Sequence, residues 1–273
     1  MTHSIAMIVA PNGARKTKQH HAALPVSVSE IRAEAVACRD AGAAMIHLHA
    51  RDPQGAHSLT INDNQAVYQQ VKQAVGDSLI VQLTTEAVGQ YTPEQQMALI
   101  RAVRPEAASF ALKELIPTQE HIPQASDFFH WVASQNILSQ YILYSPPELA
   151  EYVRLVQNGL LPEQKHHLLL VLGRYHQNQQ SEPQDLLPFF SPYFSQLKCR
   201  WAVCAFGSQE AQCLTAGALL GGDVRVGFEN NHLTLSGQPA ISNAEQVASM
   251  RQILHSLNIQ TLDAEGLRQQ LVS

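Results

Sequence analysis

The sequence predicts a single closed (β/α)8 barrel that takes up all 273 residues. Three observations support this fold class. Short β-rich runs alternate with longer amphipathic runs along the chain, which is typical of an α/β protein with a parallel sheet. The alternation gives eight strand–helix units with short connections, and no linker, repeat or low-complexity segment interrupts it. The turn after the first strand, residues 10–15, reads APNGAR, so it lacks the GxGxxG of an open Rossmann sheet.

The expected elements follow in chain order. Each strand is a short run rich in β-branched and other apolar residues. The predicted strands are Ile5–Ala10, Met45–His49, Leu79–Leu83, Ala107–Leu112, Ile137–Leu143, His167–Leu172, Trp201–Phe206 and Val224–Val226. Each helix is a longer run with apolar residues at helical spacing. The predicted helices are Val28–Ala41, Asn62–Val75, Pro93–Val103, Pro146–Asn158, one near Leu186–Leu197, Ser208–Leu220, Asn243–Leu257, and Thr261–Leu271 as an extension beyond the barrel.

Several helix boundaries carry local signals. Ser27–Glu30, Thr92–Gln95 and Ser242–Glu245 have the spacing of capping boxes, in which two side chains satisfy free amides at a helix start. Gly42 and the pair 221–222 follow predicted helices and supply the left-handed turn that ends a helix.

The composition excludes several classes of protein. Only 15% of residues are charged, against roughly 25% in an average globular protein, and 45% are apolar, so we expect a large buried core. The net charge of -5 leaves no basic surface of the kind that nucleic acids require, which favours small-molecule chemistry. The 4 cysteines form no CxxC pair, and this fits a reducing cytoplasm. Because no secretory signal and no apolar run of 18 residues is present, we expect neither secretion nor a membrane span.

Two of the 13 histidines stand out. Side chains alternate along a strand, so His47 and His49 share one face of the strand Met45–His49. Catalytic groups of such barrels lie at the carboxyl ends of the strands, and Glu229 follows the last strand, which adjoins the first. Two histidines and one carboxylate are typical of a catalytic zinc site, where the metal polarises a carbonyl or orients an enolate. The alternative is an unliganded histidine pair and a surface glutamate.

Four segments together resemble a known family. They are residues 12–14 (NGA) before a lysine-rich loop, 24–27 (LPVS), 41–52 (AGAAMIHLHARD) and 221–230 (GGDVRVGFEN). In this order they resemble the β-keto acid cleavage enzyme family, the family of the 3-keto-5-aminohexanoate cleavage enzymes, and the chain is identified as a divergent member. The resemblance extends nearly from end to end.

The resemblance implies a zinc-dependent barrel enzyme, an acyltransferase of the cleavage type, that assembles as a homotetramer. Such an enzyme condenses a β-keto acid with acetyl-CoA and releases acetoacetate and a new acyl-CoA. The ligands of Zn²⁺, or of another divalent metal, carry over to His47, His49 and Glu229. The metal would hold the substrate through its oxygens and stabilise the enolate formed when the carbon–carbon bond breaks.

Further roles carry over to residues at the strand ends. Arg225 corresponds to the cation that tunes the neighbouring acid and the reacting carboxylate. Thr84 and Thr85 replace a Ser-Thr pair that binds substrate oxygen. Asn230 stands at a catalytic position where the family usually has an aspartate that acts as the general base, and an amide cannot take this proton.

Three sources of the missing base stay open. The proton acceptor is Glu114, Glu86 or a zinc-bound hydroxide, and Asn230 then orients water or substrate. The same departure keeps two alternative functions open: a metal-dependent lyase or hydrolase of a carbonyl acid that works without CoA, and a degenerate barrel that only binds a metabolite.

The first loop predicts the character of the substrate. Arg15 stands where the aminohexanoate enzyme has an acid that suits a substrate ammonium, so we expect a far end that is neutral or anionic. Lys16 and Lys18 strengthen this cationic mouth, and the loop alternatively binds CoA phosphates or is merely solvated. Ser208 is expected to cap the following helix and to direct amides toward a phosphate or carboxylate.

Other candidates have weaker support. Arg174, after the sixth strand, is a candidate carboxylate or phosphate contact. Cys204 fits a small buried hydrophobe better than a nucleophile. His166 and His167 stand at the amino end of the sixth strand, opposite the expected chemistry.

Overall fold

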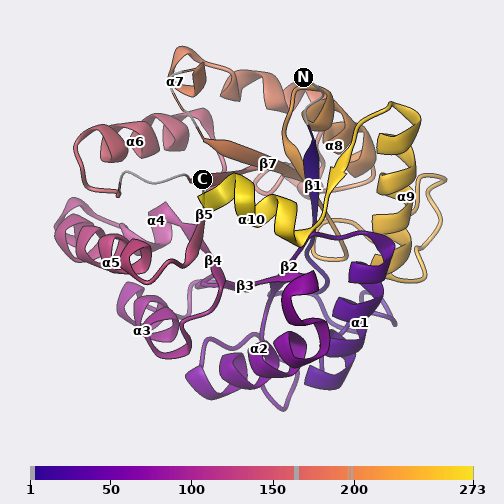
Figure 1. Ribbon diagram of the computed structural model, residues 1–273, viewed down its shortest axis with the longest axis horizontal. Helices are drawn as coiled ribbons and strands as arrows, with labels where there is room; N and C mark the ends of the chain where they lie inside the picture. The colour runs from indigo at the N-terminus through magenta and orange to yellow at the C-terminus, as the bar shows by residue number, and fades with distance from the viewer. Residues whose placement is uncertain (1–3, 163–165, 196, 198, 273) are drawn as a thin grey trace.

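The computed structural model describes residues 4–162, 166–195, 197 and 199–272. Eight parallel strands form a closed barrel, and β1 closes it by pairing with both β2 and β8. The predicted fold class is therefore confirmed (Figure 1). The barrel strands are β1 Ile5–Val9, β2 Met45–Leu48, β3 Ile80–Thr84, β4 Ala107–Ala111, β5 Leu138–Leu143, β6 His167–Leu172, β7 Arg200–Ala205 and β8 Asp223–Val226.

Helices surround the barrel as an outer ring (Figure 1). They are α1 Val28–Ala41, α2 Ile61–Val75, α3 Pro93–Val103, α4 Leu112–Leu115, α5 Ile122–Ser134, α6 Pro146–Gln157, α7 Pro192–Ser195, α8 Glu210–Leu219 and α9 Asn243–Ser256. A further helix, α10 Ala264–Val272, lies across one end of the barrel (Figure 1). None of the helices in the described ranges combines the length and the apolar character that crossing a lipid bilayer requires.

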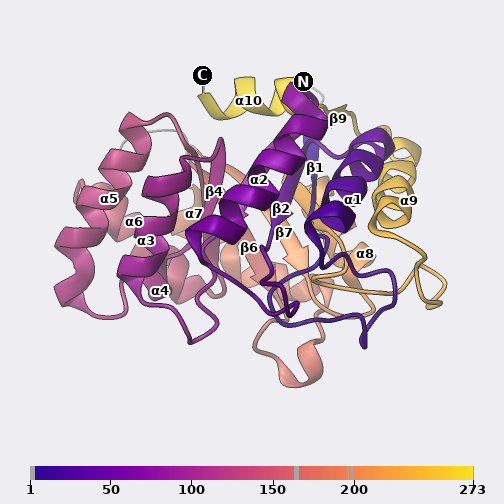
Figure 2. The same cartoon turned by 90° about the horizontal axis from the view of Figure 1, so that it is seen from below.

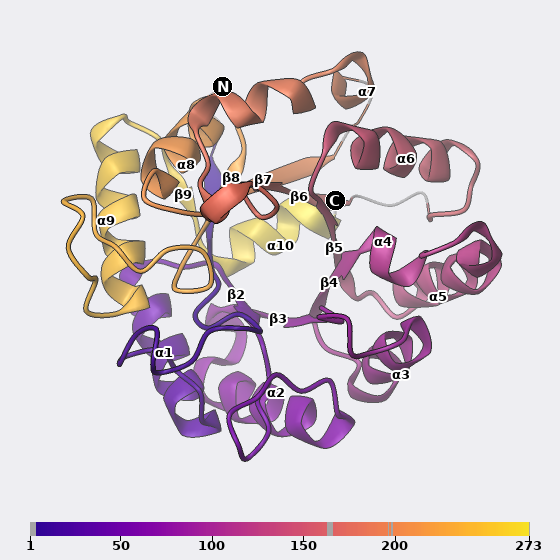
Figure 3. The same ribbon diagram turned by 180° about the vertical axis from the view of Figure 1, so that it is seen from behind.

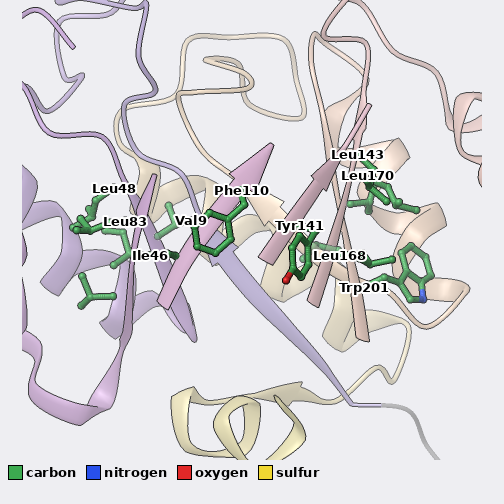
Figure 4. Packing of buried hydrophobic residues seen from close by; sticks show 14 of the residues in the cluster. Val9, Ile46, Leu48, Leu83, Phe110, Tyr141, Leu143, Leu168, Leu170 and Trp201 are labelled. Atoms are coloured by element: carbon green, nitrogen blue, oxygen red, sulfur yellow. The ribbon is translucent and has the colours of Figure 1, made fainter. Parts of the chain in front are cut away.

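Side chains of the strands point alternately out of and into the barrel, and they form two apolar layers, one between strands and helices and one inside the barrel. Ile46 and Leu48 point out of the barrel and belong to the large cluster between strands and helices (Figure 4). Phe110 of β4 is in the same layer, where its ring centroid lies 5.7 Å from that of Phe128 and 5.3 Å from that of Phe129, both on α5. Met45 packs with the inward-facing residues instead. Alternation along β2 therefore turns the odd-numbered residues, including His47, into the barrel.

The C-terminal segment closes the amino end of the barrel. A short strand, β9 Thr261–Leu262, pairs with the beginning of β1, and α10 follows it. Leu267 and Leu271 of α10 pack in the same apolar cluster as the inward-facing residues of the strands. Figures 1 and 2 show α10 lying across this end of the barrel, while long loops gather at the opposite end, seen in Figure 3. We call that opposite, carboxyl-terminal end the mouth.

The structure corrects three expectations about helices. The predicted helix near Leu186–Leu197 is broken into a 3-10 helix, Pro183–Phe189, and α7, since prolines at 188 and 192 interrupt regular helix; residue 196 lies outside the described residues. We predicted no helix between the fourth and fifth strands, where α5 forms without a side-chain cap at its start. The predicted extension Thr261–Leu271 begins as β9 and becomes helical only at Ala264.

The predicted helix boundaries are largely confirmed. Complete capping boxes form at Ser27–Glu30 and Thr92–Gln95. Ser242 caps α9, but the carboxylate of Glu245 accepts from the backbone amide of Ile241 instead of closing the box.

Candidate metal and active site

Three predicted ligands converge at the mouth because β1 joins their strands. His47 lies in β2, His49 follows it, and Glu229 follows β8. The backbone amide of Glu229 donates to the carbonyl oxygen of Ala10 over 3.1 Å, which ties the end of β8 to the end of β1. Gly227 allows this approach, since its φ is +132° and a Cβ there would collide with the backbone of Ala10.

The ligand atoms form a compact triangle. His47 Nε2 lies 3.1 Å from His49 Nε2, and Glu229 Oε2 lies 3.3 Å from His49 Nε2 and 3.8 Å from His47 Nε2. In a tetrahedral zinc site with bonds of about 2.0–2.1 Å, ligand atoms are roughly 3.3 Å apart. The triangle therefore has the size of one face of such a site.

The protonation of these groups suits a cation. Burial lowers the pKa of His47 to about 4 and that of His49 to about 3, so both rings are neutral near pH 7 and each offers a lone pair. Burial alone would raise the pKa of Glu229, but Arg225 and the two histidines outweigh it and hold this pKa well below the usual range. Glu229 Oε2 is buried without a hydrogen-bond partner among the described residues. A divalent metal fits this set of inward-facing acceptors.

Arg225 orients the carboxylate of Glu229, the third candidate ligand. It is 3% exposed, and its Nη2 donates to Glu229 Oε1 over 2.9 Å, which leaves Oε2 facing the histidines. The same Nη2 lies 3.4 Å from the sulfur of Cys204. Burial raises the pKa of that thiol to about 11, so Cys204 stays protonated.

A cavity at the mouth adjoins two of the three candidate ligands, His47 and Glu229. His47, Glu229 and Arg225 form one part of its wall, and Thr84, Glu86 and Arg174 contribute further polar groups. The remainder is mainly apolar and comes from the fourth to seventh strands and their ends: Ala111, Ile142, Tyr144, Leu169, Val171 and Phe206. The cavity therefore pairs a candidate metal site with two guanidinium groups and an apolar surface.

Two carboxylates line this cavity among the described residues: Glu229, the candidate ligand, and Glu86. Glu86 Oε1 accepts from Arg174 Nη2 over 3.0 Å, and Glu86 Oε2 lies 3.9 Å from His49 Nδ1. Burial, together with the charge of Glu229, raises the pKa of Glu86 to about 7. Glu114, the other carboxylate considered as a base, does not line the cavity, and its Oε2 accepts from the backbone amide of Ala87 over 2.9 Å.

The predicted substrate-binding residues are distributed unevenly. Thr84 lines the cavity, and its hydroxyl accepts from the amide of Glu86 over 3.0 Å. Thr85 is buried outside it and donates to the carbonyl oxygen of Ser109 over 2.9 Å. Arg15 is exposed and lines a neighbouring hollow of the mouth.

Ser208 and Asn230 lie outside the cavity lining. The expectation that Ser208 caps the helix is wrong: Gln209 occupies the cap position without a side-chain bond, and the Ser208 amide instead lies 3.3 Å from Gln180 Oε1. Ser208 lines a groove between α8 and α9. Asn230 is 3% exposed, and within the described residues its amide group has no partner.

The basic loop contributes less charge to the mouth than predicted. Lys18 pairs with Glu30 over 2.8 Å at the start of α1. Lys16 Nζ donates to the carbonyl oxygen of Phe228 over 2.7 Å, and burial lowers its pKa to about 8. The cationic groups in the cavity itself are Arg225 and Arg174, and the latter comes from the weaker candidates of the sequence.

Arg51 organises the first loop, a role that the sequence did not reveal. It is 7% exposed, and its Nη2 donates to the carbonyl oxygens of Gly13 and, over 2.9 Å, Lys16. Asn12 Nδ2 donates to the carbonyl oxygen of His49 over 3.0 Å, which ties the same loop to a candidate metal ligand. The only sequence signal was the position of Arg51 two residues after the histidine pair.

Comparison with known proteins matches residues 5–272 to the beta-keto acid cleavage enzyme family. The chain is 28% identical to the 3-keto-5-aminohexanoate cleavage enzyme of Acetoanaerobium sticklandii over 86% of each chain. It is 24% identical to the 3,5-dioxohexanoate:acetyl-CoA acetone transferase of Paraburkholderia graminis over 98% of this chain and 95% of the relative. The solved apo structure of ObcA shares the fold, with a TM-score of 0.70 at 19% identity over 91% of this chain and 65% of the length of ObcA.

Proposed function

The chain belongs to the beta-keto acid cleavage enzyme family, and we propose that it is a zinc-dependent member that condenses a β-keto acid with acetyl-CoA. The products are acetoacetate and a new acyl-CoA. The observation that carries this proposal is the cluster of His47, His49 and Glu229, two of which, His47 and Glu229, lie on the wall of a cavity that also holds two arginines. The name of the acetone transferase relative supports acetyl-CoA as the co-substrate.

His47, His49 and Glu229 would hold the metal, which would supply a Lewis acid for the keto oxygen of the substrate. The set fits this role because its three acceptor atoms face one another and Glu229 Oε2 has no other partner among the described residues. Zn²⁺ is the preferred ion for two imidazoles and one carboxylate, with another divalent metal as the alternative.

The other polar groups of the cavity bind the substrate and move the proton. Arg174 and Arg225 provide guanidinium groups for the substrate carboxylate. Thr84 provides a hydroxyl for a substrate oxygen. Glu86 takes the role of the general base that Asn230 cannot fill, because it lies in the cavity while Glu114 does not.

The substrate class follows from the charges of the mouth. Arg15 is exposed at the rim, and Arg174 lies in the cavity, so a substrate with a neutral or anionic far end is accommodated better than an amine. Homotetramer assembly is a further part of the proposal, and light scattering of the purified protein tests it independently.

The experiment incubates the zinc-loaded protein with acetyl-CoA and a panel of β-keto acids that differ only in the charge of the far end, while acetoacetate is followed. We expect turnover that depends on both CoA and zinc and that is fastest for neutral or anionic acids. Glu86→Gln should reduce kcat about 100-fold or more, in the range typical of a lost general base. Glu114→Gln is the matched control and should retain near-normal kcat.

Other outcomes contradict specific parts of the proposal. Turnover without CoA would replace the condensation by a lyase or hydrolase activity, the alternative that Asn230 motivates. Absence of turnover on the whole panel, with zinc bound and with activity appearing only in Asn230→Asp, would identify a degenerate barrel. Equal losses in Glu86→Gln and Glu114→Gln would remove Glu86 from the role of base.

A further inference from the structure

A line of buried polar side chains crosses the interior of the barrel beneath the candidate metal site. His47 Nδ1 lies 2.7 Å from Gln82 Oε1, and Gln82 Nε2 lies 3.3 Å from Gln140 Oε1. Gln140 Nε2 lies 3.1 Å from His167 Nδ1, and His167 Nε2 lies 3.0 Å from Asp223 Oδ2. These five residues are each 2% exposed or less and belong to β2, β3, β5, β6 and β8.

The far end of this line is anchored firmly. Both carboxylate oxygens of Asp223 accept from Arg200, over 2.6 and 2.5 Å, and Oδ1 also accepts from the backbone amide of Ala6 over 2.6 Å. A carboxylate held by these donors can only accept a further hydrogen bond. His167 Nε2 faces this carboxylate at ion-pair distance without completing an aligned hydrogen bond among the described residues. A lone pair on Nε2 would be repelled by the carboxylate, so we infer that Nε2 carries a proton.

The carboxylate of Asp223 determines which atom donates and which accepts in each hydrogen bond between His167 and His47. His167 Nδ1 faces the amide nitrogen of Gln140, which can only donate, so Nδ1 is the acceptor of this contact. The oxygen of Gln140 then accepts from the amide nitrogen of Gln82, and the oxygen of Gln82 accepts from His47 Nδ1. A neutral imidazole protonated on Nδ1 has its lone pair on Nε2, which is the atom that faces His49 and Glu229.

We propose that Gln82, Gln140, His167 and Asp223 form a one-way hydrogen-bond relay whose task is to hold His47 in its metal-binding tautomer. They act as positioning residues, since none of them is among the three candidate ligands. The inference rests on the proposed metal site and deepens it. It also gives His167 a role, although this residue stands at the amino end of the barrel, remote from the mouth.

Filling the interior of the barrel would not by itself require polar side chains at these positions. Inward positions of the same strands hold apolar side chains such as Met45, Ile80 and Leu169, which fill the interior without hydrogen bonds. If the amide of Gln82 or Gln140 were rotated by 180°, its nitrogen would face another donor in one of its two contacts, and its oxygen would face another acceptor in the other contact. Each amide is therefore fixed by its neighbour, and the order of the line depends on Asp223.

The test compares three glutamine variants by their affinity for Zn²⁺ in competition with a chromophoric chelator. Gln140→Met keeps the length of the side chain but provides no N–H donor and only a weak acceptor. We expect about a 10-fold loss of affinity, the lower end of the range for outer partners of a ligating histidine. Gln96→Met is the matched control, since Gln96 of α3 is 1% exposed and its amide has no partner among the described residues. It should bind Zn²⁺ like the wild type.

Gln140→Glu separates the relay from a packing role. The carboxyl group that this substitution introduces can accept from Gln82 in either charge state, so the variant should keep affinity within about threefold of the wild type. A buried acid destabilises the fold more than methionine does, so the ranking by thermal unfolding should be the reverse of the ranking by affinity. Affinities that simply follow stability, or a Gln140→Met affinity within twofold of the wild type, would overturn the relay.

Nitrogen-15 NMR of the histidine rings in metal-free protein tests the relay without any metal. We expect the wild type to show His47 protonated on Nδ1 and His167 protonated on Nε2, and Gln140→Met to show both tautomers of His47. A wild-type His47 protonated on Nε2 would overturn the relay even if zinc binds. Failure of the wild type to bind zinc, with the expected tautomers present, would instead refute the proposed metal site and leave the relay standing.

Discussion

Gly13 lies against the side chain of Glu229, the proposed carboxylate ligand, and Gly13→Ala tests how accurately Glu229 must be placed. Gly13 has φ +61°, and a Cβ added there would lie 2.7 Å from Glu229 Cγ and 3.2 Å from Glu229 Cβ. Carbon atoms in contact are normally about 3.5–4.0 Å apart, so the new methyl group overlaps Cγ by roughly 0.8 Å or more. Glu229 must therefore turn away from the added methyl group.

Two separate costs follow from this geometry. The left-handed backbone costs an alanine about 1–2 kcal/mol of folding stability. Metal sites tolerate ligand displacements of only about 0.2 Å, which is much smaller than the overlap. We therefore expect the affinity for Zn²⁺ to fall by at least about 10-fold, equivalent to about 1.4 kcal/mol.

Gly159→Ala separates the two costs. Gly159 has φ +67°, but a Cβ there would meet nothing within 4 Å. Both variants should lose similar stability in chemical unfolding, and only Gly13→Ala should lose metal affinity in chelator competition. If Gly13→Ala bound Zn²⁺ as tightly as Gly159→Ala, the position of Glu229 would not limit the site and the reasoning would be refuted.

Three further predictions concern the metal, the substrate and acid stability. Removal of Zn²⁺ by a chelator should lower the melting temperature, since a ligand at 100 times its Kd stabilises the folded state by about 2.7 kcal/mol. Calorimetry of a variant with both His47→Ala and His49→Ala should show a folded chain whose melting temperature no longer changes when Zn²⁺ is added or removed. Arg174→Met should lower kcat/KM for the β-keto acid about 10-fold or more in steady-state assays, because a charged hydrogen bond contributes about 1.5–3 kcal/mol, and an unchanged value would exclude a substrate contact. Burial lowers the pKa of His166 from 6.5 to about 4. The unfolded chain then binds the proton first, so stability is lost as the pH falls from about 6.5 to about 4, by up to about 3 kcal/mol. Unfolding of His166→Gln at pH 7 and pH 4.5 should show a smaller loss than the wild type, and equal losses would contradict this role.

Local sequence signals predicted most of the fold. The strand β6 was predicted with both of its bounds, and so were α1 and α3. These elements have capping residues or a short apolar run between turns, which are interactions within a few residues. The break between Pro183–Phe189 and α7 was missed because amphipathic spacing outweighed the prolines in our reading.

The part of the candidate site that depends on local sequence pattern was also predicted. Alternation along β2 places His47 and His49 on one face whatever the rest of the chain does. The pairing of Arg174 with Glu86 joins residues 88 positions apart and has no local signal. Lys18 illustrates the opposite error, since its charge was assigned to the mouth while Glu30 holds it at the surface.

The sequence by itself determined the alternation of elements, the inward face of β2 and the family of the chain, because these depend on periodicity and on short ordered motifs. Only the tertiary structure decided which inward side chains meet. Gln82 and Gln140 come into contact because of the stagger of β3 against the more distant β5 in the closed barrel. That stagger is fixed by packing over the whole barrel, so no segment of the sequence carries it alone.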